Sequence, residues 1–242
     1  MPKIAIVSIV VNIDVGHWLR SPRGQALLHA ETLLLDDALA DCFGWETLQV
    51  GAWGEGRALM RGARTRSRGV FAAERDRGAD VITRLSQLPV ASDSVDAVIL
   101  PHTLEFEADP YGVLREVDRV LAGEGKLLVL GFAPWSLWGL RAAVTRRGFP
   151  PGLRRTVSQR RLRDWMAVLG YDLLETRQYL FELPWGEPRD GAQSVRRGLH
   201  PLPAGAYILK ARKRMHALTP LRPRLRERRA VLGGLVEPSS IK

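Results

Sequence analysis

Three glycines with the spacing G-x-x-G-x-G, at Gly51, Gly54 and Gly56, form the first pattern in the chain that suggests chemistry. They follow Glu46–Val50, a short segment that predicts a strand. Glycine is needed where a chain turns sharply from a strand into a helix and where a bound molecule must approach the backbone. Backbone N–H groups at the start of that helix could bind a negatively charged ligand group. Glycine clusters also make ordinary turns, so the loop alone leaves both interpretations open.

Alternating strand and helix patterns surround this loop. Apolar residues at helical spacing predict a helix from about Pro22 to Ala40, with Ser21 as its N-cap. Continuous apolar runs predict two buried strands, and Asp109-Pro110 begins a helix between them. The two buried strands are 94–100 and 126–131, and the other expected strands are 46–50, 69–73, 80–83, 171–178 and 206–211; a further helix is expected at 159–169. This order predicts an α/β fold, namely a Rossmann-like, doubly wound, seven-stranded and mostly parallel sheet with helices on both faces.

The chain of 242 residues is 45% hydrophobic and 26% charged, which is typical of a globular protein. Its single cysteine, Cys42, excludes an intramolecular disulfide and a cysteine-rich metal cluster, and no metal site is expected. The apolar run Ile4–Val11 is far shorter than the roughly 20 residues of a membrane span, so we interpret it as a strand or a loosely packed leader. A cytoplasmic location is therefore expected.

The net charge of +10 is concentrated at the C-terminal end. Residues 195–242 hold twelve Lys or Arg against two Glu, which leaves the rest of the chain neutral. Such a tail could contact nucleic acid or an anionic surface. A solvated extension that keeps the protein soluble is an equally valid interpretation.

Three blocks in the middle of the chain carry a more specific pattern. They read LPVASDSVDAVILPHTLE from Leu88, DPYGVLREVDRVL from Asp109 and GKLLVL from Gly125. In order and spacing they resemble the motifs of class I S-adenosylmethionine-dependent methyltransferases, above all the type 11 group to which BioC-like and ubiquinone-biosynthesis enzymes belong. The resemblance is clear from Phe43 to Ala133 and looser to Lys210. It implies a methyltransferase domain at 43–213, an N-terminal extension at 1–42 that packs on it, and a flexible basic tail at 214–242.

The resemblance also implies S-adenosylmethionine as cofactor and a place for it. The glycine loop would lie against the methionine part, and an acidic residue after the second strand would bind the ribose hydroxyls, because a carboxylate accepts two hydrogen bonds. The residues that correspond to the family's cofactor site are Gly51, Ala52, Trp53, Gly54, Glu74, Arg84, Leu85, Ser86, Pro101 and His102. Glu74 could equally be an ordinary surface residue.

Three positions depart from the family pattern. Gln49 stands where the family usually has an acid, and Trp53 occupies a glycine's place in the loop. Arg84 stands where an aspartate often accepts the adenine amino group. Arginine cannot accept a hydrogen bond but could stack on the adenine. Losing two acidic anchors would weaken cofactor binding, so a non-catalytic member of the family remains an alternative.

The hypothesis for function is methyl transfer to a small-molecule or lipid-like acceptor. The displacement is in line and needs alignment and exclusion of water, but no metal. By analogy His102 could act as a base, or it could instead shape the pocket through hydrogen bonds. Trp135 and Trp138 could contact the acceptor or pack against helices. The alternative is a degenerate methyltransferase fold that binds nucleic acid or a partner through its tail. The oligomeric state stays open.

Overall fold

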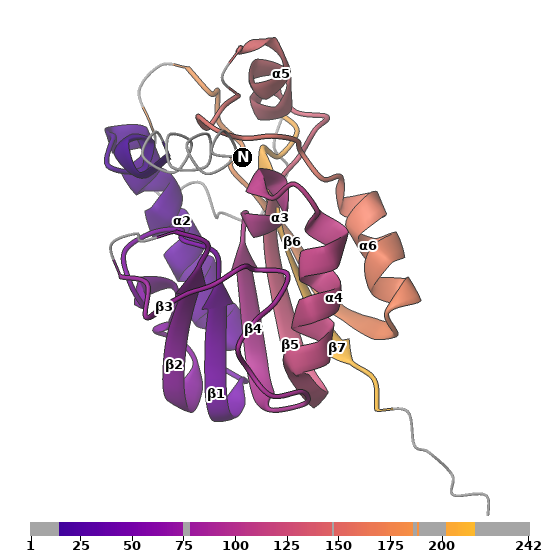
Figure 1. The fold of residues 1–242 in the computed structure, drawn as a ribbon. Helices are drawn as coiled ribbons and strands as arrows, with labels where there is room; N and C mark the ends of the chain where they lie inside the picture. The colour runs from indigo at the N-terminus through magenta and orange to yellow at the C-terminus, as the bar shows by residue number, and fades with distance from the viewer. Residues whose placement is uncertain (1–14, 75–77, 147, 186–187, 189–201, 216–242) are drawn as a thin grey trace, which may run out of the picture.

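The computed structural model describes residues 15–74, 78–146, 148–185, 188 and 202–215. Its centre is a seven-stranded sheet in the order β3-β2-β1-β4-β5-β7-β6 (Figure 1). The strands are β1 (Phe43–Val50), β2 (Arg64–Ala72), β3 (Val81–Ile82), β4 (Val95–Pro101), β5 (Leu121–Phe132), β6 (Tyr171–Tyr179) and β7 (Ala206–Lys213). Neighbours from β3 to β5 are parallel, whereas β7 runs antiparallel to both β5 and β6. The predicted doubly wound, mostly parallel sheet is confirmed.

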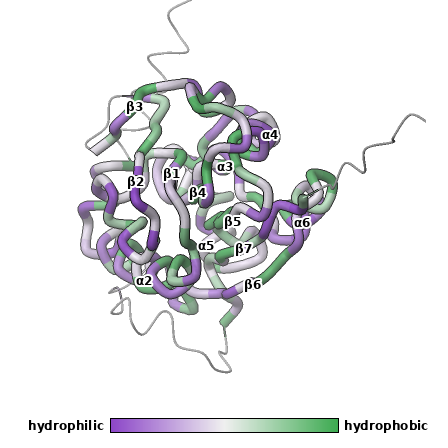
Figure 2. The backbone as a smooth tube through the Cα atoms, turned by 90° about the horizontal axis from the view of Figure 1, so that it is seen from below, coloured by the Kyte–Doolittle hydropathy of each residue, from purple (hydrophilic) through white to green (hydrophobic). Residues whose placement is uncertain are grey.

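Helices cover both faces of this sheet. Figure 2, which views the sheet along its strands, shows α2 on one side and α4 and α6 on the other. The helices are α2 (Pro22–Leu39), α3 (Thr103–Phe106), α4 (Pro110–Val120), α5 (Leu137–Val144) and α6 (Gln159–Val168). Ser21, the predicted N-cap of α2, accepts a hydrogen bond from the backbone N–H of Gly24, and Asp109 caps α4 in the same way by accepting from Gly112; a proline follows each cap.

Two apolar cores result, one on each face of the sheet. Leu48 and Val50 of β1 face the core beneath α4 and α6, while α2 packs on the opposite core. The central strand β4 is buried on both faces, as its unbroken apolar run predicted. Among the described helices, none has the length and apolarity needed to cross a membrane.

The connection from β1 to β2 differs from the expectation. A helix was expected to start after the glycine loop, but residues 51–63, all of them described, contain only the 3₁₀ helix η1 (Ala58–Met60). The helix α2 already covers this face, and it approaches so closely that a Cβ on Gly62 would lie 2.5 Å from the Cα of Asp36. The expectation of a helix N-terminus beside the loop was therefore wrong, because α2 occupies the space.

Other differences lie at element ends. The strands β1, β2 and β5 begin several residues earlier than predicted. Helix α5 was not predicted, although Ser136 caps it by accepting a hydrogen bond from the backbone of Gly139. The segment Ile4–Val11 and the tail beyond Met215 lie outside the described residues.

Candidate functional site

A cavity of about 360 Å³ lies at the carboxyl edge of the sheet, between the start of the chain and the glycine loop. Open α/β sheets bind ligands at this edge, and the volume falls within the range of small-molecule sites. One wall comes from the N-terminal helical segments and includes Leu19, Arg20, Gln25 and Leu28. The other comes from the loops after β1 and β2 and includes Ala52, Gly54, Glu55, Gly56 and Gly78.

Backbone rather than side chains forms much of the second wall. Gly54, Gly56 and Gly78 all have positive φ angles, at 79°, 52° and 95°. A Cβ on Gly78 would lie 2.5 Å from the Cα and the nitrogen of Gly56, so the loops can meet only because Gly78 has no side chain. The wall formed by these three glycines, here called the glycine cradle, leaves room for a ligand against the main chain. A larger side chain at these positions would reduce that room.

Gln49, which stands where the family usually has an acid, holds the glycine loop in place by hydrogen bonds. Its Nε2 atom donates hydrogen bonds of 3.0 Å to the carbonyl oxygens of both Gly51 and Trp53. A carboxylate could not make these bonds, because it has no proton to donate. The departure at Gln49 thus has a structural reason: the amide holds the loop by its carbonyl groups.

The predicted loop residues have different places. Ala52 and Gly54 line the cavity. Gly51 instead allows close packing, since a Cβ there would lie 2.2 Å from the Thr103 hydroxyl, which itself hydrogen-bonds the Val50 carbonyl. The Trp53 side chain is 3% exposed and points into the core. The side chain packs among other rings and is turned away from the cavity, so contact of Trp53 with a cofactor stays a prediction for its backbone alone.

Five buried side chains form a polar network beneath the loop. Glu31 of α2 is its hub: Oε2 accepts from the indole N–H of Trp53 at 2.6 Å, and Oε1 lies 2.8 Å from His102 Nε2 and 3.0 Å from the donating Tyr179 hydroxyl. The other ring nitrogen of His102, Nδ1, lies 3.0 Å from Glu105 Oε2. Glu31, His102 and Tyr179 are each 0% exposed. The network therefore joins α2, the glycine loop, β4 and β6.

This network holds buried charge. Burial alone would lower the pKa of His102, but the carboxylates of Glu31 and Glu105 outweigh burial and raise it from 6.5 to about 9. The imidazole is therefore protonated at neutral pH and donates to both carboxylates. Burial raises the pKa of Glu105, which also accepts a 2.9 Å hydrogen bond from the Phe132 backbone.

His102 does not have the position of a catalytic base. Both ring nitrogens are bound to carboxylates, the ring is 0% exposed, and Phe132 stacks on it with centroids 4.1 Å apart. A protonated, enclosed imidazole cannot accept a proton from an acceptor molecule. The expectation of a base at His102 was wrong. The other interpretation, a histidine that hydrogen-bonds the loop backbone and shapes the pocket, also differs from the structure, because the ring binds two carboxylates and His102 does not line the cavity.

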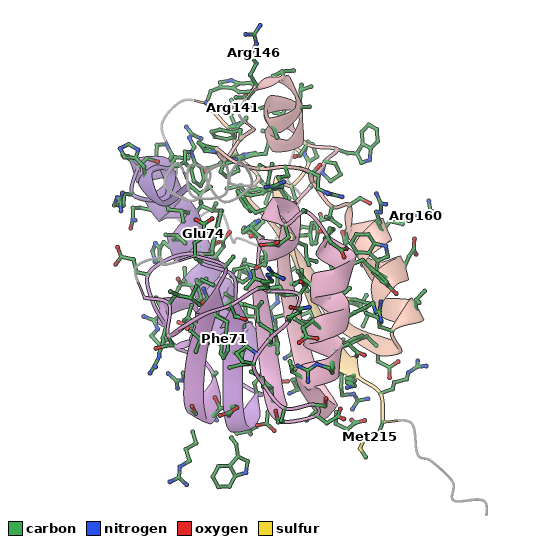
Figure 3. The ribbon with its side chains drawn as sticks, viewed as in Figure 1. Phe71, Glu74, Arg141, Arg146, Arg160 and Met215 are labelled. Atoms are coloured by element: carbon green, nitrogen blue, oxygen red, sulfur yellow. The ribbon has the colours of Figure 1, made fainter. Side chains whose placement is uncertain are left out.

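The remaining cofactor candidates are spread along the same edge. Glu74 is half-buried and lies above the carboxyl ends of β1 and β2, between α2 and α3 (Figure 3). Arg84 and Ser86 are exposed after β3, while Leu85 is buried in the core under α4. Pro101 is buried at the end of β4. Their contact with a cofactor stays a prediction.

The two candidate acceptor residues differ sharply. Trp138 is 1% exposed, and its indole N–H donates to the Glu182 carbonyl at 2.9 Å. It is a core residue of α5, so the expectation that it contacts the acceptor was wrong. Trp135 is 90% exposed and stays a candidate.

Sequence reasoning missed Arg20, Gln25 and Gly78 of the cavity wall, and Glu31 of the network. A signal existed for Glu31, because it is a carboxylate on the face of α2 that also carries the buried Leu27 and Leu34. Arg20, Gln25 and Gly78 lie on segments in which the sequence shows no motif.

Comparison with known proteins agrees with the α/β fold described above. Residues 63–129 match the family model of the methyltransferase domain. This part of the chain is a methyltransferase domain. S-adenosylmethionine is the cofactor of that family, and the type 11 group named from the sequence is confirmed.

Two curated relatives and one solved structure illustrate the likeness. The chain is 34% identical over 177 residues to the uncharacterized protein Mb2026c of Mycobacterium bovis, a match that spans 69% of this chain and 60% of that protein. It is 40% identical over 102 residues to the uncharacterized protein YafS of Escherichia coli, which spans 41% and 42%. The chain thus matches less than two thirds of either relative. A possible histamine N-methyltransferase from Thermotoga maritima shares the fold, with a TM-score of 0.57 at 20% identity over 88% of this chain and 100% of that one.

The polar network of the methyltransferase domain can be tested at Trp53. Trp53→Phe keeps an aromatic ring but removes the N–H that donates to Glu31. Because a buried charged acceptor loses its donor, we expect the free energy of unfolding to fall by about 2–3 kcal/mol in urea denaturation. Trp135→Phe is the matched control, and at 90% exposure it should change this free energy by less than about 0.5 kcal/mol. Equal effects of the two substitutions would contradict the network.

Proposed function

We propose that the chain binds S-adenosylmethionine in the cavity beside the glycine loop and transfers its methyl group to a small-molecule or lipid-like acceptor. The observation that carries this proposal is the cavity wall made by the glycine loop, at the edge of the sheet where the family binds its cofactor. The printed name of the Thermotoga protein, a possible histamine N-methyltransferase, refers to a small acceptor and supports the same class here.

The residues of the cavity suit this cofactor. The glycine cradle allows a ligand to approach the main chain, as the loops after β1 and β2 bring Gly54, Gly56 and Gly78 into one wall. Arg20 supplies a cation for the carboxylate of the cofactor's amino-acid part, and Glu55 supplies an anion for its ammonium group. Glu74 stays the candidate for the ribose hydroxyls, and Leu85 and Ser86 stay the candidates for the adenine.

Bound S-adenosylmethionine supplies an electrophilic methyl group on a sulfonium. The protein's part is to hold the donor, align the acceptor in line and exclude water. In this chain the network of Glu31, His102 and Trp53 holds the glycine loop, so these residues position the site and take no proton from the acceptor. An acceptor that is already a neutral or anionic nucleophile needs no base.

A thermal-shift titration with S-adenosylmethionine and S-adenosylhomocysteine tests cofactor binding. At a ligand concentration of about 100 times Kd the stabilisation should be about 2.7 kcal/mol, which for a chain of this size raises Tm by roughly 5–10 °C. Ala52→Phe should abolish the shift, because Ala52 lines the cavity and a phenyl ring would fill it.

The matched control for this titration is Ala143→Phe, at an exposed position of α5 outside the cavity lining, which should leave the shift unchanged. Absence of any shift in the unmodified protein at millimolar cofactor would overturn the proposal. A shift that Ala52→Phe does not alter would mean that the cofactor binds elsewhere.

The alternative, a non-catalytic protein that binds nucleic acid or a partner through its tail, is not favoured by the family match. The tail beyond Met215 lies outside the described residues, and its role stays a prediction.

A further inference from the structure

Helix α5 exposes apolar side chains that have no role in the cavity. Leu140 and Val144 are 55% and 73% exposed, and their spacing of four residues places them on one face of the helix. The opposite face packs inward through Trp138. A helix that is apolar on both faces is normally buried on both, so the outer face of α5 lacks its usual cover.

Two further segments extend this apolar surface. Trp135, directly before α5, is 90% exposed. On the other side, the Arg141 guanidinium donates to the carbonyl oxygen of Pro184, and this contact places the neighbouring Leu183 and Trp185 beside α5. Leu183 is 43% and Trp185 51% exposed. We call the five residues Trp135, Leu140, Val144, Leu183 and Trp185 the α5 patch.

The stretch of chain from the start of α5 into α6 carries only positive charges, whereas Glu182 precedes the patch residue Leu183. Residues 133–163 contain eight arginines and no aspartate or glutamate. Arg146 projects from the outer end of α5, and Arg160 lies at the upper end of α6, on the same side of the molecule (Figure 3). Arg154 and Arg155, in the loop between these helices, are exposed. An apolar surface with a rim of arginines is complementary to a bilayer that contains anionic lipid.

The residue types of the α5 patch indicate whether it suits a membrane or a nucleic acid as its binding partner. Tryptophan sits well at the interface between lipid headgroups and acyl chains, and leucine and valine gain by leaving water. Single-stranded nucleic acid is held by aromatic stacking and arginine, and exposed aliphatic side chains such as Leu140 and Val144 add nothing to it. The aliphatic stripe thus favours lipid.

We propose that the α5 patch and its arginine rim dock the protein on an anionic phospholipid surface. The docking face lies at the carboxyl end of the sheet, where α5 stands above the strands (Figure 1). The edge that carries the cavity is then turned toward the bilayer. This inference goes beyond methyl transfer and does not depend on cofactor binding.

Sedimentation with vesicles tests the proposal. The full chain is mixed with vesicles of phosphatidylcholine alone or of phosphatidylcholine with phosphatidylglycerol. We expect binding at least about tenfold tighter to the anionic vesicles, with a loss of affinity as salt is raised. The double substitution Leu140→Glu with Val144→Glu should weaken this binding by about tenfold or more, because it places carboxylates on the face that meets the lipid.

Val168→Glu provides the matched control, since Val168 on α6 is 77% exposed and lies outside the patch. It should leave vesicle binding unchanged. The pair Arg146→Gln with Arg154→Gln should reduce binding to anionic vesicles, whereas Arg66→Gln on β2 should not. Thermal unfolding and the cofactor titration of each variant separate loss of docking from loss of folding or of cofactor binding.

Three results would overturn the proposal. The first is equal, weak binding to both kinds of vesicle. The second is a change of oligomeric state in the Leu140/Val144 variant without any vesicle binding by the unmodified chain, which would assign the patch to a second copy. The third is tight binding to single-stranded RNA with no retention on anionic vesicles.

Discussion

Glu31→Ala is expected to lower the free energy of unfolding by about 3–5 kcal/mol, or roughly 6–20 °C in Tm. The carboxylate joins three other side chains of the network, namely Trp53, His102 and Tyr179. Its removal leaves a buried indole N–H and a buried phenol without an acceptor. It also leaves the protonated His102 with Glu105 as its one remaining carboxylate.

Asp36→Ala is the matched control for Glu31→Ala. Asp36 lies on the same helix and forms an ion pair with Arg61, but the two side chains are 26% and 67% exposed. Water already screens this pair, so its loss should cost less than about 1 kcal/mol. Urea denaturation of both variants measures the contrast. Similar losses for the two would show that the buried carboxylate contributes no more than a surface one.

The same substitution separates folding from function. Glu31 anchors the glycine loop to α2. A variant that folds but no longer anchors this loop should therefore bind S-adenosylmethionine more weakly. Glu31→Gln keeps the shape of the side chain and one acceptor oxygen, but its NH2 group faces hydrogen-bond donors of the network. It should therefore fall between the unmodified chain and Glu31→Ala in unfolding free energy.

Regular patterns made the sheet predictable from the sequence. The apolar run of β4 and the proline-led helix α4 depend on local rules: burial on both faces for the strand, and the Asp109 cap for the helix. These rules need no knowledge of distant residues. The motifs of residues 88–130 added the resemblance to a known family, whereas the order of the strands in the sheet was not predicted.

The site was less predictable because its contacts join distant parts of the chain. Trp53 was placed correctly in the glycine loop, yet the direction of its side chain depends on Glu31, which lies 22 residues earlier on another element. His102 meets Glu31 across 71 residues. No spacing rule connects such positions, so a histidine at the end of β4 suggested a base where the fold makes a buried ion pair. Likewise α2 displaced the helix expected after the loop.

Stability is expected to fall as pH rises from about 6.5 to 9, and His102 is the cause. The carboxylates of Glu31 and Glu105 raise its pKa in the folded protein to about 9, above the 6.5 of an ordinary imidazole. The folded state therefore binds this proton more tightly than the unfolded state does. The resulting stabilisation, about 3 kcal/mol, is complete below pH 6.5 and is lost progressively as pH approaches 9.

Burial also shifts two other groups. It raises the pKa of Glu105 above 4.5, so the folded state loses stability as pH rises through the titration of this carboxyl. It raises the pKa of Cys42 from 9.0 to about 11, which affects stability only above pH 9. Urea denaturation at several values between pH 6.5 and 9 must therefore compare the unmodified chain with a His102 variant.

His102→Gln should remove this slope, while His17→Gln, at an exposed histidine, should preserve it. If His102→Gln does not fold, the ring signal of His102 in an NMR titration of the unmodified chain gives the same information. A midpoint near 6.5, or a stability that stays level between pH 6.5 and 9, would mean that the imidazole is neutral. The ion pairs with Glu31 and Glu105 would then be ordinary hydrogen bonds, and the large cost expected for Glu31→Ala would shrink with them, since no buried positive charge would be left behind.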